Sequence, residues 1–310
     1  MKILVTGGAG YIGSVLVPEL LKSNHQVTVI DNFLYDQRSL NMCCQYKNFE
    51  LINSDVRDFS RYDKSLKSAD LIIPLAAIVG APACSKKPIE AKGVNNDNLM
   101  DLFKLVSQEQ MFIMPTTNSA YGTGDENNFC DENTPLKPIS QYAKEKVEVE
   151  KVLLEHKNAV SLRLATVFGV SNRMRIDLLV NDFVYRAKKD GFVVLYEPEF
   201  KRNYIHVKDV VKAFLHVMEN YEIMNKNIYN VGLSNANLSK IELCEEIKRQ
   251  LPNFIFPVEH NQKDPDQRNY LVSNAKIEAT GYKPEVSISE GIRELIVGYE
   301  SMTSSKYTNI

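Results

Sequence analysis

The chain of 310 residues contains few cysteines and histidines, and neither residue type is clustered. The cysteines are odd in number and lack C-x-x-C spacing, which argues against a disulfide framework and against a zinc site. They lie at Cys43, Cys44, Cys84, Cys130 and Cys244. The five histidines are equally dispersed and lack the spacing of metal ligands. We therefore expect no metal, and we expect the cysteines to be small buried apolar residues.

Long apolar runs and blocks of one charge are also missing. No apolar run approaches the roughly 20 residues of a membrane-spanning helix. The net charge of −2 includes no basic cluster that would suit nucleic acid or an acidic membrane surface. The chain starts with a strand-like segment instead of the charged and apolar regions of a signal peptide. We expect a cytoplasmic protein without nucleic-acid or membrane partners.

The most informative segment is the apolar stretch at residues 2–6 and the glycine-rich turn that follows it. Its glycines recur every third position, and an apolar helical pattern comes next. Glycines let the backbone turn tightly and approach a pyrophosphate, whose charge is stabilised by free N–H groups at the start of a helix. The segment is thus typical of a dinucleotide-binding turn. The expected cofactor contacts are Gly7, Gly10, Tyr11, Ile12 and Gly13.

A carboxylate at the end of the next strand indicates which dinucleotide is bound. Residues 26–31 alternate as a strand and end in Asp31, which lies 18 positions after Gly13. An Asp at this separation accepts hydrogen bonds from both hydroxyls of the adenosine ribose and repels a 2'-phosphate. NAD is therefore favoured over NADP, with Asn32 as a neighbouring cofactor residue.

The first half of the chain alternates between strand and helix patterns, which is typical of an α/β fold. The predicted strands are 2–5, 26–31, 49–52, 70–75 and 111–115. Repeated βα units indicate a doubly wound parallel (Rossmann) sheet with helices on both faces. Pro74 and Pro115 are expected where this sheet ends, because proline cannot donate to a central ladder. Later elements are a strand at 160–169 and helices from near 140 and at about 208–219, 239–250 and 288–300.

The domain organisation follows from this alternation. We expect residues 1–170 to form an NAD-binding Rossmann domain, to which roughly 203–233 return. We expect 171–202 and 234–310 to form a smaller C-terminal substrate-binding lobe. The ends of the later strands should supply further cofactor contacts, at Asp55, Val56, Leu75, Ala76, Ala77 and Thr116.

A second motif carries acid/base chemistry. Tyr142 and Lys146 are four residues apart, so they share one face of a helix. The lysine charge should favour the phenolate and lower the tyrosine pKa from its usual value of about 10. Tyr142 would then be a usable acid/base near neutral pH. Thr117, at the end of the fifth strand, carries a hydroxyl that can bridge the substrate oxygen and this tyrosine.

These motifs resemble the extended short-chain dehydrogenases/reductases that act on nucleotide-diphosphate sugars. Thr117 stands four residues before a Tyr-Gly pair, as a Ser or Thr does in that family. The resemblance covers nearly the whole chain, including 202–209, 230–232, 264–268 and 281–284. It implies that Thr117, Tyr142 and Lys146 are the catalytic residues and that NAD is also contacted by Tyr142 and Lys146. It also implies a homodimer or higher homo-oligomer, since helices beside the active-site lysine pair two subunits in this family.

The resemblance also indicates the substrate-binding residues. Arg202 and Arg268 are the expected diphosphate ligands, with Arg173 third, because a guanidinium fork binds two phosphate oxygens at once. The other candidates are Cys84, Asn118, Ser119 and Thr166. Cys84 could face the sugar, although a packing role is the alternative for this small residue.

Three positions depart from the family pattern and narrow the reaction. Asn118 and Ser119 stand where 4,6-dehydratases carry Asp-Glu, so the carboxylates for elimination are missing. Ser119 also stands where 3,5-epimerases carry a Cys, and a serine is the poorer acid/base. Thr166 replaces an Asn that often contacts the sugar nucleotide. The remaining chemistry is hydride transfer with one proton shuttle, at carbon 4 of the sugar.

Several segments look most like bacterial GDP-heptose 4-dehydrogenases of surface-polysaccharide pathways: 75–84, 117–119, 167–175 and 202–206. A nucleotide-sugar 4-epimerase would use the same catalytic residues and re-reduce the 4-keto sugar from its other face. A non-catalytic dinucleotide-binding protein on the same fold is the third interpretation. The intact catalytic residues disfavour it, but no residue selects GDP or a heptose.

Overall fold

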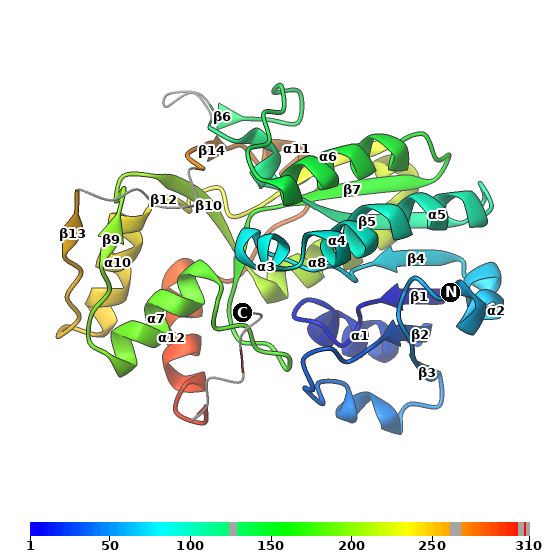
Figure 1. The fold of residues 1–310 in the computed structure, drawn as a ribbon, viewed down its shortest axis with the longest axis horizontal. Helices are drawn as coiled ribbons and strands as arrows, with labels where there is room; N and C mark the ends of the chain where they lie inside the picture. Colours follow the sequence, from blue (N-terminus) through cyan, green and yellow to red (C-terminus); the bar gives the residue numbers. More distant parts are fainter. Residues whose placement is uncertain (124–128, 261–267, 303–306, 308–310) are drawn as a thin grey trace.

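The centre of the molecule is a seven-stranded parallel sheet with the order β11-β7-β5-β4-β1-β2-β3 (Figure 1). The computed structural model describes residues 1–123, 129–260, 268–302 and 307. The strands are β1 (Lys2–Thr6), β2 (Gln26–Asp31), β3 (Phe49–Asn53), β4 (Leu71–Pro74), β5 (Met111–Thr117), β7 (Ala159–Leu164) and β11 (Asn227–Val231). This arrangement confirms the predicted doubly wound sheet. The order reverses between β1 and β4, where such sheets bind ligands.

Helices cover both faces of this sheet because neighbouring side chains of a strand point to opposite faces. Ile3 and Val5 point into the core beneath α1 and α8, whereas Leu4 points into the core beneath α2, α5 and α6. These helices are α1 (Gly13–Lys22), α2 (Asp63–Ser68), α5 (Asn98–Leu105), α6 (Gln141–Leu153) and α8 (Val207–Glu219). The predicted helix near 140 is α6, and its Ser140 hydroxyl accepts a hydrogen bond from the Ala143 N–H.

A second hydrophobic core lies beside the large sheet, on the left in Figure 1. It is built by a three-stranded sheet in the order β12-β10-β8 and by three helices with buried apolar faces. These elements are β8 (Thr166–Phe168), β10 (Lys201–His206), β12 (Asn237–Ser239), α7 (Leu179–Lys189), α10 (Lys240–Gln250) and α12 (Ile288–Gly298). Two short parallel pairs accompany them: β9 (Leu195–Tyr196) with β13 (Val258–Glu259), and β6 (Phe129–Cys130) with β14 (Leu271–Val272).

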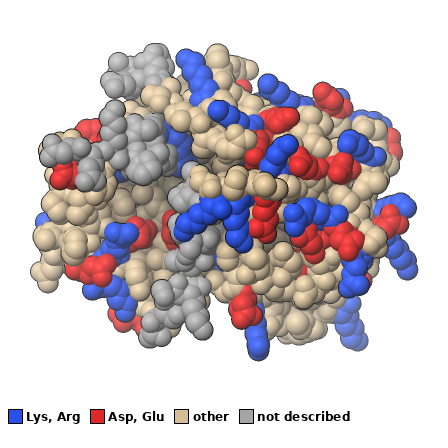
Figure 2. Space-filling model, in the orientation of Figure 1, with Lys and Arg blue, Asp and Glu red and all other residues tan. Residues whose placement is uncertain are grey.

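Short helices complete the described chain: α3 (Ala81–Lys86), α4 (Pro88–Lys92), α9 (Tyr221–Met224) and α11 (Ala275–Glu278). Across the described residues, no helix combines the length and the apolar character that crossing a bilayer requires. On the face drawn in Figure 2, Lys and Arg side chains are interspersed with Asp and Glu side chains.

The strand predicted at 160–169 is two strands in two sheets. β7 lies in the large sheet and ends at Leu164, while β8 pairs with β10 in the smaller sheet. Ala165 lies between them, and its N–H still donates to the Val231 carbonyl at 2.9 Å. Because β11 ends at Val231, the following residues must pair elsewhere, and β10 provides that partner.

The prediction that Pro115 ends its strand was wrong. β5 continues to Thr117, and Pro115 pairs with Leu162 of β7. The Phe112 N–H donates toward β7 and the Met111 N–H donates toward β4, so the nitrogen of Pro115 also faces β4. The β4–β5 ladder has already ended at Phe112, and the missing N–H of Pro115 therefore costs no ladder bond.

Candidate active site

A pocket opens at the carboxyl ends of β1, β2 and β4, beside the reversal in strand order. Most of the predicted cofactor residues line it: Gly7, Gly10, Asp31, Asn32, Asp55, Val56, Leu75, Ala76 and Ala77. The residue types and the shape fit an extended dinucleotide.

The glycine turn is required by two close backbone approaches. Gly7 has a φ of +68°, and a Cβ there would lie 2.5 Å from the Ala76 nitrogen. A Cβ at Gly13 would lie 2.5 Å from the Gly8 carbonyl oxygen. The turn therefore packs directly on the end of β4 and places the start of α1 at the pocket, where unpaired N–H groups can receive a pyrophosphate.

Asp31 is oriented by two backbone donors. Its carboxylate oxygens accept hydrogen bonds from the Ala9 N–H at 2.9 Å and the Phe33 N–H at 2.8 Å. Burial raises the pKa of Asp31, and these two hydrogen bonds oppose that rise. Each oxygen retains a second lone pair that can accept from a ribose hydroxyl.

Asp55 is paired in a way that the sequence did not indicate. Its carboxylate binds the Arg57 guanidinium through two hydrogen bonds of 2.9 and 2.6 Å, which lowers the pKa of Asp55. Both residues still line the pocket. Arg57 therefore restrains a carboxylate that we expect to contact the cofactor.

Two predicted cofactor residues have side chains committed elsewhere. The Tyr11 hydroxyl donates to the Gly169 carbonyl at 2.7 Å, so this ring packs in the second core and leaves only its backbone for the cofactor. The Thr116 hydroxyl contacts the Glu150 carboxylate and the Ser161 hydroxyl, each at 2.9 Å. These contacts occupy the Thr116 hydroxyl, so the predicted cofactor role of Thr116 would fall to its backbone.

The proposed catalytic groups lie on neighbouring elements, at the end of β5 and on α6. Thr117 caps the short turn after β5, since its Oγ1 accepts from the Ser119 N–H at 3.1 Å and its hydroxyl donates to Ser119 Oγ at 2.9 Å. Tyr142 and Lys146 lie on the first turns of α6. Tyr142 packs on a small apolar cluster that includes Ile78, which also lines the pocket. The tyrosine is thus adjacent to the inner end of the pocket.

The electrostatics of this pair differ from the prediction. Burial raises the pKa of Tyr142 to about 12, and the largest opposing effects come from Arg175 and Arg268 instead of Lys146. Burial also lowers the pKa of Lys146 to about 8, with this residue only 4% exposed. The sequence missed Arg175 because nothing in its local pattern indicates that it lies near Tyr142.

Cys84 lies beside α6, the helix that carries Tyr142 and Lys146 and that we call the catalytic helix. Its thiol donates to the Ile78 carbonyl at 3.2 Å, and it contributes to the raised pKa of Tyr142. Burial raises the pKa of the Cys84 thiol. The thiol is therefore a neutral packing group against Tyr142 at neutral pH.

Asn118 and Ser119 lie in the short buried turn that follows Thr117. Asn118 is 1% exposed, and neither polar atom of its amide has a hydrogen-bond partner among the described residues. The Ser119 hydroxyl accepts a hydrogen bond from the Arg268 guanidinium, although the two residues are 149 positions apart. The rest of the predicted diphosphate loop, 264–267, lies outside the described residues.

Arg202 comes close to Arg268 through two tyrosines. Its guanidinium lies 5.7 Å from the centre of the Tyr270 ring and donates to the Lys201 carbonyl at 3.0 Å. The buried Tyr204 hydroxyl lies in the field of both guanidinium groups, and each opposes the rise in the pKa of Tyr204 that burial causes. The two predicted diphosphate ligands thus both lie near Tyr204. Thr166 pairs with Tyr204 across β8 and β10.

The third predicted diphosphate ligand lies elsewhere. Arg173 lines the cofactor pocket together with Asp31 and Tyr35. The chain after β8 crosses to the start of α1, which carries Arg173 away from Arg202 and Arg268. This position favours a cofactor role for Arg173, and its assignment to the substrate stays a prediction.

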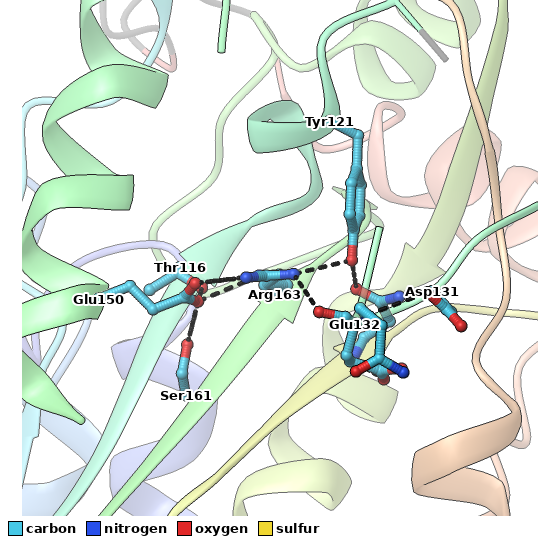
Figure 3. Close-up of polar contacts among 9 residues, drawn as sticks. Thr116, Tyr121, Asp131, Glu132, Glu150, Ser161 and Arg163 are labelled. Carbon is cyan, nitrogen blue, oxygen red and sulfur yellow. Dashed lines mark hydrogen bonds and ion pairs between the residues drawn. The ribbon is translucent and has the colours of Figure 1, made fainter. Parts of the chain in front are cut away.

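A buried polar network behind the site was only partly visible in the sequence (Figure 3). Arg163 of β7 bonds to Glu150 of α6, to the Tyr121 hydroxyl and to the Glu132 carbonyl. The Tyr121 hydroxyl in turn donates to Asn230 of β11 at 2.8 Å. These bonds connect the catalytic helix, the turn after Thr117 and the last strand of the sheet. No local pattern of the sequence indicates the partners of Arg163, because they are 13 or more positions away along the chain.

Known proteins are similar to the whole chain. The model of the NAD dependent epimerase/dehydratase family matches residues 3–232. A putative UDP-glucose 4-epimerase of Methanocaldococcus jannaschii is 24% identical over 95% of this chain and 97% of its own length. UDP-glucuronic acid decarboxylase 3 of Arabidopsis thaliana is 28% identical over 94% of this chain and 87% of its own length.

The fold comparison agrees with these matches. The crystal structure of Thermus thermophilus UDP-glucose 4-epimerase with NAD has a TM-score of 0.83 and 25% identity, and the match covers 98% of this chain and all of that one. The family model covers well over half of the sequence, and the matched region contains the glycine turn, Thr117, Tyr142 and Lys146. The chain therefore belongs to the NAD dependent epimerase/dehydratase family and is an NAD-dependent enzyme.

Proposed function

We propose that this enzyme oxidises carbon 4 of a nucleotide-diphosphate sugar, and that it is a GDP-heptose 4-dehydrogenase of surface-polysaccharide synthesis. One observation carries the substrate class: Arg268 reaches across 149 positions to Ser119, two residues from Thr117. A guanidinium suited to a diphosphate is thereby placed beside the candidate reaction site. The similar proteins act on UDP-sugars by name, which supports the same substrate class.

The residues support a simple division of labour. Bound NAD supplies the hydride acceptor. The Thr117 hydroxyl holds the sugar oxygen, and Tyr142, once deprotonated, accepts the proton of the carbon 4 hydroxyl. Because burial raises the pKa of Tyr142 to about 12, the positive charges of Lys146 and of bound NAD must lower it before the tyrosine can act as this base. Carbon 4 then becomes a carbonyl. Lys146 holds a positive charge near the phenolate below its pKa of about 8.

The pocket supports the placement of NAD. Gly7 and Gly10 leave space for the pyrophosphate, and Asp31 accepts hydrogen bonds from the ribose. The small side chains of Ala76 and Ala77 leave space for the nicotinamide. In this proposal residues 1–170 and about 203–233 hold NAD, while 171–202 and 234–310 hold the substrate. Arg173 is an exception to that division.

A nucleotide-sugar 4-epimerase is the second candidate, because the M. jannaschii and T. thermophilus proteins are named as 4-epimerases. Epimerisation and oxidation share the first step. Decarboxylation would begin with the same oxidation. When the sugar carries a carboxylate on carbon 5, a ketone at carbon 4 makes it a β-keto acid, which can lose carbon dioxide. The side chains of Asn118 and Ser119 provide no carboxylate for a dehydratase.

The test is incubation of the purified enzyme with GDP-heptose, GDP-mannose, UDP-glucose and UDP-glucuronic acid. NADH absorbance and mass spectrometry distinguish the outcomes. A 4-keto sugar with stoichiometric NADH supports the dehydrogenase. A neutral isomer without net reduction supports the epimerase, and loss of carbon dioxide supports a decarboxylase. If the Tyr142→Phe variant turned over any of these sugars at the wild-type rate, oxidation through Tyr142 would be refuted.

The oligomeric state belongs to the same proposal. We propose a homodimer or higher homo-oligomer that pairs through helices beside Lys146. Sedimentation of the purified enzyme measures this directly, and a monomer at micromolar concentration would contradict it.

A further inference from the structure

Arg173 and Tyr35 form a stacked pair in the wall of the cofactor pocket. The guanidinium carbon lies 4.0 Å from the centre of the Tyr35 ring, within cation–π distance. Both residues line the pocket that contains Asp31 and the glycine turn. Arg173 is only 3% exposed, although it carries a positive charge. Its charged group thus lies in a pocket that must receive an anion.

The position of Arg173 is fixed by the turn that binds the pyrophosphate. Its backbone N–H donates to the Ser14 hydroxyl oxygen at 3.1 Å. The Ser171 hydroxyl donates to the Tyr11 carbonyl at 2.7 Å, and the Asn172 amide donates to the Ser14 carbonyl at 3.0 Å. The segment after β8 is therefore attached to the first turn of α1.

The surrounding charges favour an additional anion at this place. Burial and the neighbouring Arg175 both lower the pKa of Arg173, to about 10, so the guanidinium remains charged at neutral pH. Arg175 is itself bound to Asp177 through two hydrogen bonds. Asp177 and Asp31 attract Arg173, but their effects on its pKa are smaller than those of burial and of Arg175. A phosphate oxygen would offset both burial and repulsion through charge-assisted hydrogen bonds.

We propose that Arg173 and Tyr35 clamp the adenosine diphosphate part of NAD, with the guanidinium bound to its anionic oxygens and the tyrosine ring holding the guanidinium in place. Arg173 comes from the chain between the two sheets, and its contact with NAD would add to those of the glycine turn and Asp31. Arg173 is thereby a cofactor ligand that slows NAD release. The inference depends on NAD binding and is independent of which sugar is oxidised.

The test measures NAD directly. The holoenzyme is loaded with isotopically labelled NAD, and its exchange for unlabelled NAD is followed for the wild type and for Arg173→Ala, Arg173→Lys, Tyr35→Leu and Tyr35→Phe. Loss of one charge-assisted contact predicts a release rate roughly 10- to 100-fold faster in Arg173→Ala. The release rate of Arg173→Lys should lie between those of the wild type and Arg173→Ala, because lysine keeps the positive charge but lacks the planar guanidinium. Tyr35→Phe should resemble the wild type and Tyr35→Leu should release faster.

Arg186→Ala is the matched control, since this guanidinium is exposed on α7 and pairs with Asp182. Wild-type NAD release in Arg173→Ala would overturn the proposal. Equal acceleration in Arg186→Ala would also overturn it, because the effect would then be general. If Arg173→Ala raises the KM for the sugar with NAD release unchanged, Arg173 serves the substrate and the clamp is refuted. If Arg173→Ala fails to fold, the same exchange measurement is made on the two Tyr35 variants. Faster NAD release in Tyr35→Leu than in Tyr35→Phe supports the clamp, and equal release rates in the two variants overturn it.

Discussion

The Arg163 guanidinium and the Glu150 carboxylate form a buried ion pair with an Nη2–Oε1 distance of 2.6 Å and side chains 4% and 5% exposed. The pair joins β7 to α6, two turns beyond Tyr142 on the same helix. Glu150 also accepts hydrogen bonds from the hydroxyls of Thr116 and Ser161. The catalytic helix is therefore held against the sheet by charge as well as by apolar packing.

Removing one partner of this pair should be costly. Arg163→Met leaves the Glu150 carboxylate buried without its counter-charge, and we expect a loss of about 3–5 kcal/mol in the free energy of unfolding. The double variant with Glu150→Gln should lose less than Arg163→Met alone, since no buried charge remains. Urea unfolding measures both. The control variant Lys104→Met breaks an exposed ion pair with Asp101 and should change the free energy of unfolding by less than about 1 kcal/mol. If Lys104→Met lost as much stability as Arg163→Met, the special cost of breaking the buried pair would be contradicted.

The buried amine of Lys146 should make stability depend on pH. Its pKa is about 8 in the folded protein and 10.5 in the exposed chain. Below pH 8 the amine is protonated in both states, and burying the charge costs up to about 3 kcal/mol. As the pH rises through 8 toward 10.5, the folded state releases its proton first, so that cost disappears and stability rises.

The measurement compares the wild type with Lys146→Met by urea unfolding between pH 7 and 10. The stability of the wild type relative to this variant should increase over that range. Lys144→Met, which alters an exposed residue of the same helix, should show no such trend. A constant difference between the wild type and Lys146→Met would show that the burial of the amine has no such cost.

Gly7 should be irreplaceable for NAD binding. An alanine Cβ would overlap the Ala76 backbone, which cannot move without shifting β4. We expect Gly7→Ala to bind NAD at least tenfold more weakly and to unfold more easily. Gly191 is the control, because it also has positive φ (+76°) but its Cβ would meet no atom within 4 Å. Gly191→Ala should lose about 1 kcal/mol of stability through backbone strain and bind NAD as tightly as the wild type. Calorimetry measures NAD affinity in both variants. If both lost affinity to a similar extent, backbone strain would explain the loss and the close approach to Ala76 would not.

Asn118 should contribute to substrate binding without stabilising the fold. Its unpartnered amide already bears a desolvation cost, so Asn118→Leu should be at least as stable as the wild type. The KM for the sugar nucleotide should rise roughly tenfold, since the amide would lose its bonds to the substrate. Asn181→Leu removes an amide that bonds to Gly169 and Arg175, and it should lose about 2 kcal/mol on thermal unfolding. An unchanged KM in Asn118→Leu would remove Asn118 from the substrate site.

The local patterns of the sequence determined most elements of the fold. Glycine spacing, strand alternation and the Tyr142–Lys146 interval depend on neighbours within a few residues, and the structure contains the strands and helices that they predict. The Ser287 hydroxyl and the Glu290 carboxylate similarly mark the start of α12 through a local capping box. Such signals can be read from the chain because the interacting groups are close in sequence.

The tertiary structure decided which distant side chains meet. Arg268 reaches Ser119, Arg163 reaches Glu150, and Arg173 lies in the cofactor pocket. It also determined that burial dominates the pKa of Tyr142 and that the Thr116 hydroxyl binds Glu150. These outcomes depend on the path of each connection between strands and on the dielectric surroundings of each group. Neither property is encoded in the spacing of nearby residues, so only the folded chain reveals them.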